Sequence, residues 1–172
     1  RRDLCRAGLG EHRLHLRQGL HRAFDATLHA QRLFKADGRH AGRRESDVLL
    51  VEDNRVNQIV FSQILEGLGL SWRLATSGEE ALRLFVEQAP SVVLLDTTLA
   101  DIDGFEVARR MRDLSGEKRI PVVGVITHAF EGDLDKCLAS GMEDMLLKPV
   151  SPDMVEAVFV RLFGKDVLQL QA

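Results

Sequence analysis

Residues 48–54 read VLLVEDN, an apolar run of four residues followed at once by two carboxylates and an asparagine. A short aliphatic run without alternation is typical of a strand that is buried on both faces of a parallel sheet. Polar residues directly after such a strand lie at its carboxyl end, where open α/β sheets bind their ligands. This stretch therefore predicts a buried strand of a parallel sheet with a candidate ligand site at its end.

The pattern of a strand followed by a helix repeats along residues 47–164. Apolar runs at 92–95, 122–126 and 145–147 predict further buried strands. The more polar run at 71–75 predicts a strand at the edge of the sheet.

The first helix of the series is predicted by four apolar residues at helical spacing, which are Val56, Ile59, Val60 and Ile64. Glycines at 67 and 69 predict its end, because glycine adopts the left-handed conformation that closes many helices. With the helices expected after the other strands, the chain alternates five strands with five helices. This order predicts an α/β fold, a doubly wound parallel sheet with helices on both of its faces.

Three of the predicted strands end in charged residues, which are Glu52-Asp53, Asp96 and Lys148. The carboxyl ends of parallel strands meet at one edge of a sheet, so these side chains are expected to converge there. Carboxylates that lie so close repel one another, and a hard cation such as Mg²⁺ compensates this repulsion. Lysine pairs with a carboxylate or with a phosphoryl group. The pattern predicts Mg²⁺-assisted phosphoryl transfer onto a carboxylate.

Residues 47–164 resemble the receiver domains of response regulators, the CheY-like family, and most of all the receivers of hybrid sensor histidine kinases. The resemblance is carried by VLLVEDNRVNQ at 48–58, Asp96, Asp103-Gly104, Gly132-Asp133, Lys136-Cys137-Leu138, Gly141-Met142 and Lys148-Pro149. It implies a flavodoxin-like sheet with the strand order 2-1-3-4-5.

The same resemblance implies a role for each charged residue. Asp96 would accept a phosphoryl group from phosphohistidine, and Lys148 would pair first with Asp96 and then with the phosphoryl group. Mg²⁺ would be the cofactor, bound by Glu52, Asp53, Asp96 and the backbone carbonyl of Thr98. The implied partner is a histidine kinase or a histidine phosphotransfer domain.

Two positions that read out phosphorylation in this family are altered. The family has Ser or Thr at the end of the fourth strand and an aromatic residue in the fifth, where this chain has Ile126 and Met145. Thr127 is adjacent, but neighbouring strand residues point to opposite faces, so it replaces the lost hydroxyl only if the register shifts. Ala100 stands in place of the usual proline. We expect Asp96 to accept phosphate slowly or with little conformational consequence.

Two functions of different classes remain open. The first is a phosphorelay receiver, and the second is a phosphorylation-independent docking module that has kept the fold and lost the switch. A phosphatase of the haloacid-dehalogenase type is set aside, because such enzymes carry a second Asp where this chain has Thr98. The chain also has no glycine-rich nucleotide loop. No turnover reaction of its own is therefore expected.

The segments outside the predicted receiver differ from it in charge. Residues 1–46 carry a net charge of +6 and residues 47–172 a net charge of −9. The basic residues of the first segment are scattered among Leu and Phe, which predicts an amphipathic helix and a linker. A second interpretation is the tail of a preceding, degenerate receiver. Residues 165–172 are predicted to be a C-terminal tail, with no nucleic-acid-binding region after residue 164.

The cellular setting is predicted from what the sequence lacks. No apolar run approaches the roughly 20 residues that span a bilayer, and two cysteines are too few for a disulfide framework. These features predict a cytoplasmic protein without membrane insertion. The chain begins with Arg1, so we expect a piece of a longer kinase, whose other parts would tether it to the inner membrane. Weak or conditional dimerisation is also expected.

Overall fold

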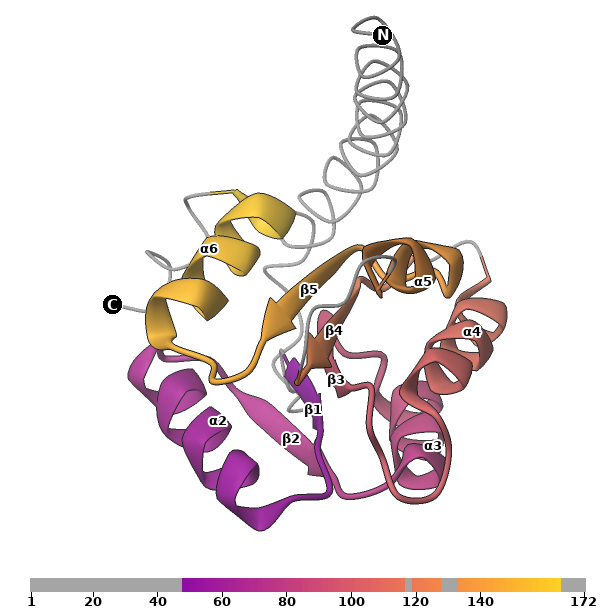
Figure 1. Ribbon diagram of the computed structural model, residues 1–172, viewed down its shortest axis with the longest axis horizontal. Coiled ribbons are helices and arrows are strands. Elements are labelled where there is room, and N and C mark those ends of the chain that lie inside the picture. The colour runs from indigo at the N-terminus through magenta and orange to yellow at the C-terminus, as the bar shows by residue number, and fades with distance from the viewer. Residues whose placement is uncertain (1–47, 117–118, 128–132, 165–172) are drawn as a thin grey trace, which may run out of the picture.

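Short apolar strands alternate with helices throughout the part of the chain that the computed structural model describes, residues 48–116, 119–127 and 133–164 (Figure 1). In chain order the elements are β1 (Val48–Val51), α2 (Arg55–Gly67), β2 (Trp72–Ala75), α3 (Gly78–Gln88), β3 (Val92–Asp96), α4 (Gly104–Ser115), β4 (Val122–Ile126), α5 (Asp133–Ala139), β5 (Asp144–Leu147) and α6 (Pro152–Phe163). The helix and linker predicted for residues 1–46, the tail at 165–172 and Gly132 lie outside the described residues, so those boundaries stay predictions.

The five strands form one parallel sheet in the order β2-β1-β3-β4-β5. Strands β1 and β3 are buried along their whole length, as their uninterrupted apolar sequences predicted. The chain runs from β1 outward to β2 and then crosses back to β3, so the strand order reverses between β1 and β3. The predicted flavodoxin-like order is confirmed, and the reversal marks the ends of β1 and β3 as the place for a ligand.

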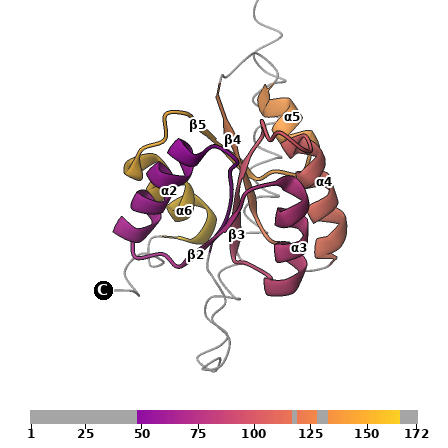
Figure 2. The ribbon, with the colours of Figure 1, turned by 90° about the horizontal axis from the view of Figure 1, so that it is seen from below.

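Helices cover both faces of the sheet (Figure 2). Helices α2 and α6 pack on one face through a cluster that includes Leu50 and Phe159. Helices α3, α4 and α5 pack on the other face through a cluster that includes Leu49 and Met111. Leu49 and Leu50 are neighbours in β1 and point into opposite clusters, because successive strand residues alternate between the faces. None of the helices among the described residues is long and apolar enough to cross a membrane.

The face of α2 that packs on the sheet is not the face formed by the four apolar residues from which the helix was predicted. Of the four residues that predicted the helix, only Ile64 is buried, whereas the other three are exposed: Val56, Ile59 and Val60. The buried residues of α2 are Phe61, Ile64 and Leu65. These three residues stand at i, i+3 and i+4 and form a second apolar stripe, which packs into the core beside Leu50 and Phe159. Asn57 and Gln58 in the first turn donate hydrogen bonds back to Glu52.

Candidate functional site

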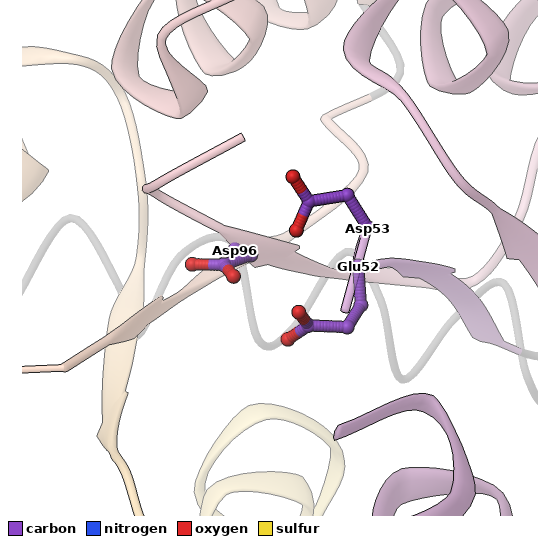
Figure 3. A group of neighbouring side chains, drawn as sticks. All are labelled: Glu52, Asp53 and Asp96. Carbon is purple, nitrogen blue, oxygen red and sulfur yellow. The ribbon is translucent and has the colours of Figure 1, made fainter. Parts of the chain in front are cut away.

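Three carboxylates meet at the carboxyl ends of β1 and β3 (Figure 3). Glu52 and Asp53 directly follow β1, and Asp96 is the last residue of β3. One oxygen from each lies within 4.8 Å of the others. Glu52 is 1% exposed and Asp96 3%, whereas Asp53 is half-buried. The structure thus brings together the three acids that the strand ends singled out in the sequence.

Lys148 enters this cluster from the end of β5. Its Nζ lies 2.7 Å from Asp96 Oδ2 and 2.8 Å from Glu52 Oε2. The pairing with Asp96 was expected, and the second partner, Glu52, was not. The following peptide bond, Lys148–Pro149, is cis. One ammonium group therefore binds two buried carboxylates at once.

The electrostatics of the cluster follow from burial and from this lysine. Burial raises the pKa of Glu52 above its usual value, against the opposing hydrogen bond from Lys148. Burial also acts to raise the pKa of Asp96, but hydrogen bonds from Lys148 and the Thr98 amide outweigh it and lower that pKa. The pKa of Lys148 is raised, because its two carboxylate partners outweigh its desolvation. With three acids and one lysine, the site is attractive to a cation.

Glu52 is oriented by the start of α2. Its Oε1 accepts hydrogen bonds from the Asn54 amide and from Asn57 Nδ2, both at 3.1 Å, and its backbone carbonyl accepts one from Gln58 Nε2 at 2.8 Å. The Asn54 side chain caps the same helix. Sequence reasoning did not assign a role to Asn57. Its position five residues after Glu52, on the first helical turn, is the signal that could have found it.

The loop after β3 supplies contacts to both aspartates. The backbone amide and the hydroxyl of Thr98 donate to Asp96 Oδ1 at 3.0 and 3.1 Å. The amide of Ala100 donates to Asp53 Oδ2 at 3.0 Å. A proline at position 100 could not make this bond, because proline has no backbone N–H. The exchange of proline for alanine therefore adds a link between the loop and Asp53.

The donor set fits Mg²⁺. This ion prefers oxygen ligands at about 2.1 Å, so that opposite ligands lie about 4.2 Å apart. The three carboxylate oxygens lie within 4.8 Å of one another, a spread comparable to that of ligands around one ion. The backbone carbonyl of Thr98 is the fourth oxygen that the family resemblance implied. Glu52, Asp53, Asp96 and Thr98 are therefore the residues that would hold the ion.

The two readout positions at which the sequence departs from the receiver family, Ile126 and Met145, lie on β4 and β5. Ile126 is the last residue of β4 and is 4% exposed, and it pairs in register with Leu147. Thr127 is exposed, and Met145 is partly buried against the cluster under α3, α4 and α5. Ile126 is therefore the buried residue at the end of β4, and Thr127 after it faces solvent.

The chain is similar in sequence to a known protein family. Residues 48–159 match the family described as the response regulator receiver domain. The polar-differentiation response regulator DivK of Brucella ovis is 34% identical over 112 residues, which cover 64% of this chain and 91% of that protein.

Solved structures agree with this match. The receiver domain of the sensor histidine kinase PA1611 from Pseudomonas aeruginosa PAO1, with a magnesium ion coordinated in its active-site cleft, superposes with a TM-score of 0.64 at 33% identity. That similarity covers 70% of this chain and 98% of PA1611's receiver. A co-crystal structure of the Saccharomyces cerevisiae histidine phosphotransfer protein Ypd1 with the receiver domain of Ssk1 matches with a TM-score of 0.60 at 27% identity, over 73% of this chain and 97% of the matched chain.

Proposed function

Because this chain belongs to the response regulator receiver family, we propose that it is a phosphorelay receiver that accepts a phosphoryl group on Asp96. The observation that carries the proposal is the position of Lys148 Nζ, 2.7 Å from Asp96 and 2.8 Å from Glu52. A partly buried lysine shared by two buried acids costs desolvation, and such arrangements of charge are common at functional sites, here one that would bind phosphate.

In the proposed reaction a carboxylate oxygen of Asp96 attacks the phosphorus of a phosphohistidine. A new P–O bond forms while the P–N bond breaks, and its electron pair stays on the nitrogen. The phosphohistidine ring carries a proton on its other nitrogen before the transfer, so the imidazole leaves as a neutral ring that keeps this proton. Lys148 stays protonated, since its pKa is raised by its acidic partners, and it holds first Asp96 and then the phosphoryl oxygens.

Mg²⁺ is the proposed cofactor, with Glu52, Asp53, Asp96 and the Thr98 carbonyl as its ligands. When bound, the ion supplies positive charge that offsets the repulsion between the carboxylates and the incoming phosphoryl oxygens. The magnesium ion in PA1611's receiver supports this assignment.

The proposed partner is a histidine kinase or a histidine phosphotransfer domain. A phosphohistidine reaches Asp96 from the carboxyl edge of the sheet, next to which α2 begins, two residues after Asp53. The first half of α2 exposes the apolar side chains of Val56, Ile59 and Val60. Apolar side chains beside a transfer site suit a protein partner. The Ypd1–Ssk1 complex supports this choice of partner.

We further propose that the receiver unit spans residues 47–164 and belongs to a hybrid sensor histidine kinase in the cytoplasm. The similarity to PA1611's receiver supports the kinase setting. The alternative of a phosphorylation-independent docking module draws on Ile126 and Met145. These side chains are expected to weaken the readout, whereas the three acids and Lys148, which would bind Mg²⁺ and the phosphoryl group, are kept.

The test is the intact-protein mass after incubation with Mg²⁺ and acetyl phosphate. The natural chain is expected to gain one phosphoryl group, and Asp96→Asn is expected to gain none. Asp113→Asn, the same exchange at an exposed position of α4, is the matched control and should behave like the natural chain. If the natural chain binds Mg²⁺ yet gains no mass, the receiver function is wrong and the docking module takes its place.

A further inference from the structure

The loop between β3 and α4, residues 97–103, carries Thr98 and is tied tightly to the end of β3. The amide of Gly104 donates to the carbonyl of Thr97 at 3.2 Å. A Cβ on Gly104 would lie 2.4 Å from the carbonyl oxygen of Asp96, a clash with backbone that cannot relax. The loop can therefore fold back beside Asp96 only because position 104 has no side chain.

On the side of the loop that faces the acidic cluster, the Ala100 amide donates to Asp53 Oδ2 at 3.0 Å. Ala100 lies two residues after Thr98, the residue whose carbonyl is a proposed Mg²⁺ ligand. One short segment thus carries one proposed ligand and hydrogen-bonds another. The position of this segment sets the distance between the Thr98 carbonyl and the Asp53 carboxylate.

The next residue, Asp101, anchors the segment to a different element. Its Oδ1 accepts from the Gly78 amide at 2.9 Å and its Oδ2 from the Glu79 amide at 3.1 Å. These amides belong to the first turn of α3, where the helix itself offers no acceptors. A Cβ on Gly78 would lie 2.8 Å from Val107 Cγ2, so glycine permits the close approach of α3 to the loop and α4. Both carboxylate oxygens of Asp101 are therefore bound to a helix that is anchored in the core.

We propose that Asp101 is a positioning residue for the Mg²⁺ site, although it contacts none of the proposed ligands. Through Ala100 it holds Asp53, and it anchors the loop segment that carries the Thr98 carbonyl. This inference rests on the proposed function, since it presumes that the acidic cluster binds Mg²⁺. Outer residues that orient metal ligands typically change metal affinity about 10- to 100-fold, and Asp101 acts one step farther out. Its loss is therefore expected to weaken Mg²⁺ binding about 3- to 10-fold.

The experiment measures the Mg²⁺ dissociation constant of the full 172-residue chain by isothermal titration calorimetry, together with the midpoint of urea unfolding. The variants are Asp101→Ala and Asp101→Asn, because asparagine keeps one acceptor oxygen and the same shape. Ser77→Ala is the matched control. Ser77 caps the same end of α3 by accepting from the Glu80 amide, and it has no hydrogen bond to the loop.

The expected result is a weaker dissociation constant for Asp101→Ala, a smaller change for Asp101→Asn, and no change for Ser77→Ala. If Asp101→Ala does not fold, the Asp101→Asn variant carries the test by itself. An unchanged dissociation constant in the Asp101 variants, with normal binding by the natural chain, overturns this inference and leaves the proposed function standing. Equal weakening by Ser77→Ala also overturns it, because loosening of α3 would then explain the effect. If the natural chain itself binds no Mg²⁺, the metal part of the proposed function fails and this inference falls with it.

Discussion

A buried or partly buried group of paired charges lies at each end of the strands, one at their carboxyl ends (the carboxyl edge) and one at their amino ends (the amino edge). The two groups differ in their charge balance. At the carboxyl edge, Lys148 binds Glu52 and Asp96, and Asp53 adds another carboxylate nearby. At the amino edge, Arg112 of α4 contacts Glu143 at 2.6 Å, and Glu143 also accepts from the Val122 amide at the start of β4.

The difference in charge balance distinguishes a candidate cation site at the carboxyl edge from a structural ion pair at the amino edge. Arg112 and Glu143 balance each other, and Arg112 also donates to the carbonyl of Gly141. The carboxyl edge keeps an excess of negative charge in a place where burial makes that charge costly. Burial raises the pKa of Glu143 and of Glu52 alike. Of these two clusters, the one at the carboxyl edge is where the proposed Mg²⁺ would balance the remaining charge.

The largest effect is expected at the amino edge. Replacing Glu143 by Ala leaves the Arg112 guanidinium partly buried without its counter-charge and should lower the free energy of unfolding by about 3 kcal/mol. Urea denaturation measures this loss, and the Mg²⁺ dissociation constant should not change. The double variant Arg112→Met with Glu143→Gln should recover most of the loss, because no unpaired charge remains. A large change in the Mg²⁺ dissociation constant of Glu143→Ala would contradict the view that the two edges act independently.

The next effect concerns Lys148, the cation of the carboxyl edge. Lys148→Met should lower the free energy of unfolding by about 2 kcal/mol in the absence of Mg²⁺, because Glu52 and Asp96 lose their shared partner. Mg²⁺ should restore part of this loss, so that the ion stabilises the variant more than the natural chain. Urea denaturation with and without Mg²⁺ tests this. Lys136→Met, at an exposed ion pair of α5, is the control and should show neither effect.

A smaller effect, on phosphorylation instead of stability, is expected at Ile126 near the carboxyl edge. Ile126→Thr introduces a hydroxyl that can donate to the phosphoryl group, a charged hydrogen bond worth about 1.5 kcal/mol. The phosphorylated form should therefore persist roughly tenfold longer, as followed by intact mass after removal of acetyl phosphate. Ile126→Val removes a similar amount of buried apolar surface without adding the hydroxyl, and it should decay like the natural chain. Equal decay of all three proteins would show that the residue at position 126 does not affect the lifetime of the phosphorylated form.

The smallest effect is a pH dependence from Glu52. Its folded-state pKa is raised, so its ionisation destabilises the folded protein. Without Mg²⁺, Glu52→Gln and the natural chain should differ little below pH 4.5, the ordinary value. The variant should gain stability relative to the natural chain as the pH rises from there through the raised pKa. Urea midpoints between pH 4 and pH 8 check the trend. Adding Mg²⁺ should reverse the advantage, because the variant lacks one proposed ligand.

The strands and the charged residues at their ends could be predicted because both follow from local sequence. An uninterrupted apolar run such as 92–95 has few alternatives to a buried strand, and Asp96 then falls at its end. The rotation of α2 was predicted wrongly, because the sequence of this helix offers two apolar stripes. The apolar residues Val56, Ile59 and Val60 suggested the buried face, whereas the stripe that packs into the core is Phe61, Ile64 and Leu65. Spacing by itself did not decide between the two stripes.

From residue order alone followed the alternation of strands and helices, the three acids at the strand ends and the apolar Ile126 at the end of β4, since each depends on a local run and on the rules of parallel sheets. The strand order was implied by the resemblance to the receiver family. The contacts that make these residues a site depend on segments far apart in the chain. Lys148 and Glu52 are 96 residues apart in sequence and sit on strands that are not neighbours in the sheet. Asp101 reaches α3 across 23 residues. Spacing within one segment carries no information about such distances, because the packing of helices and strands sets them.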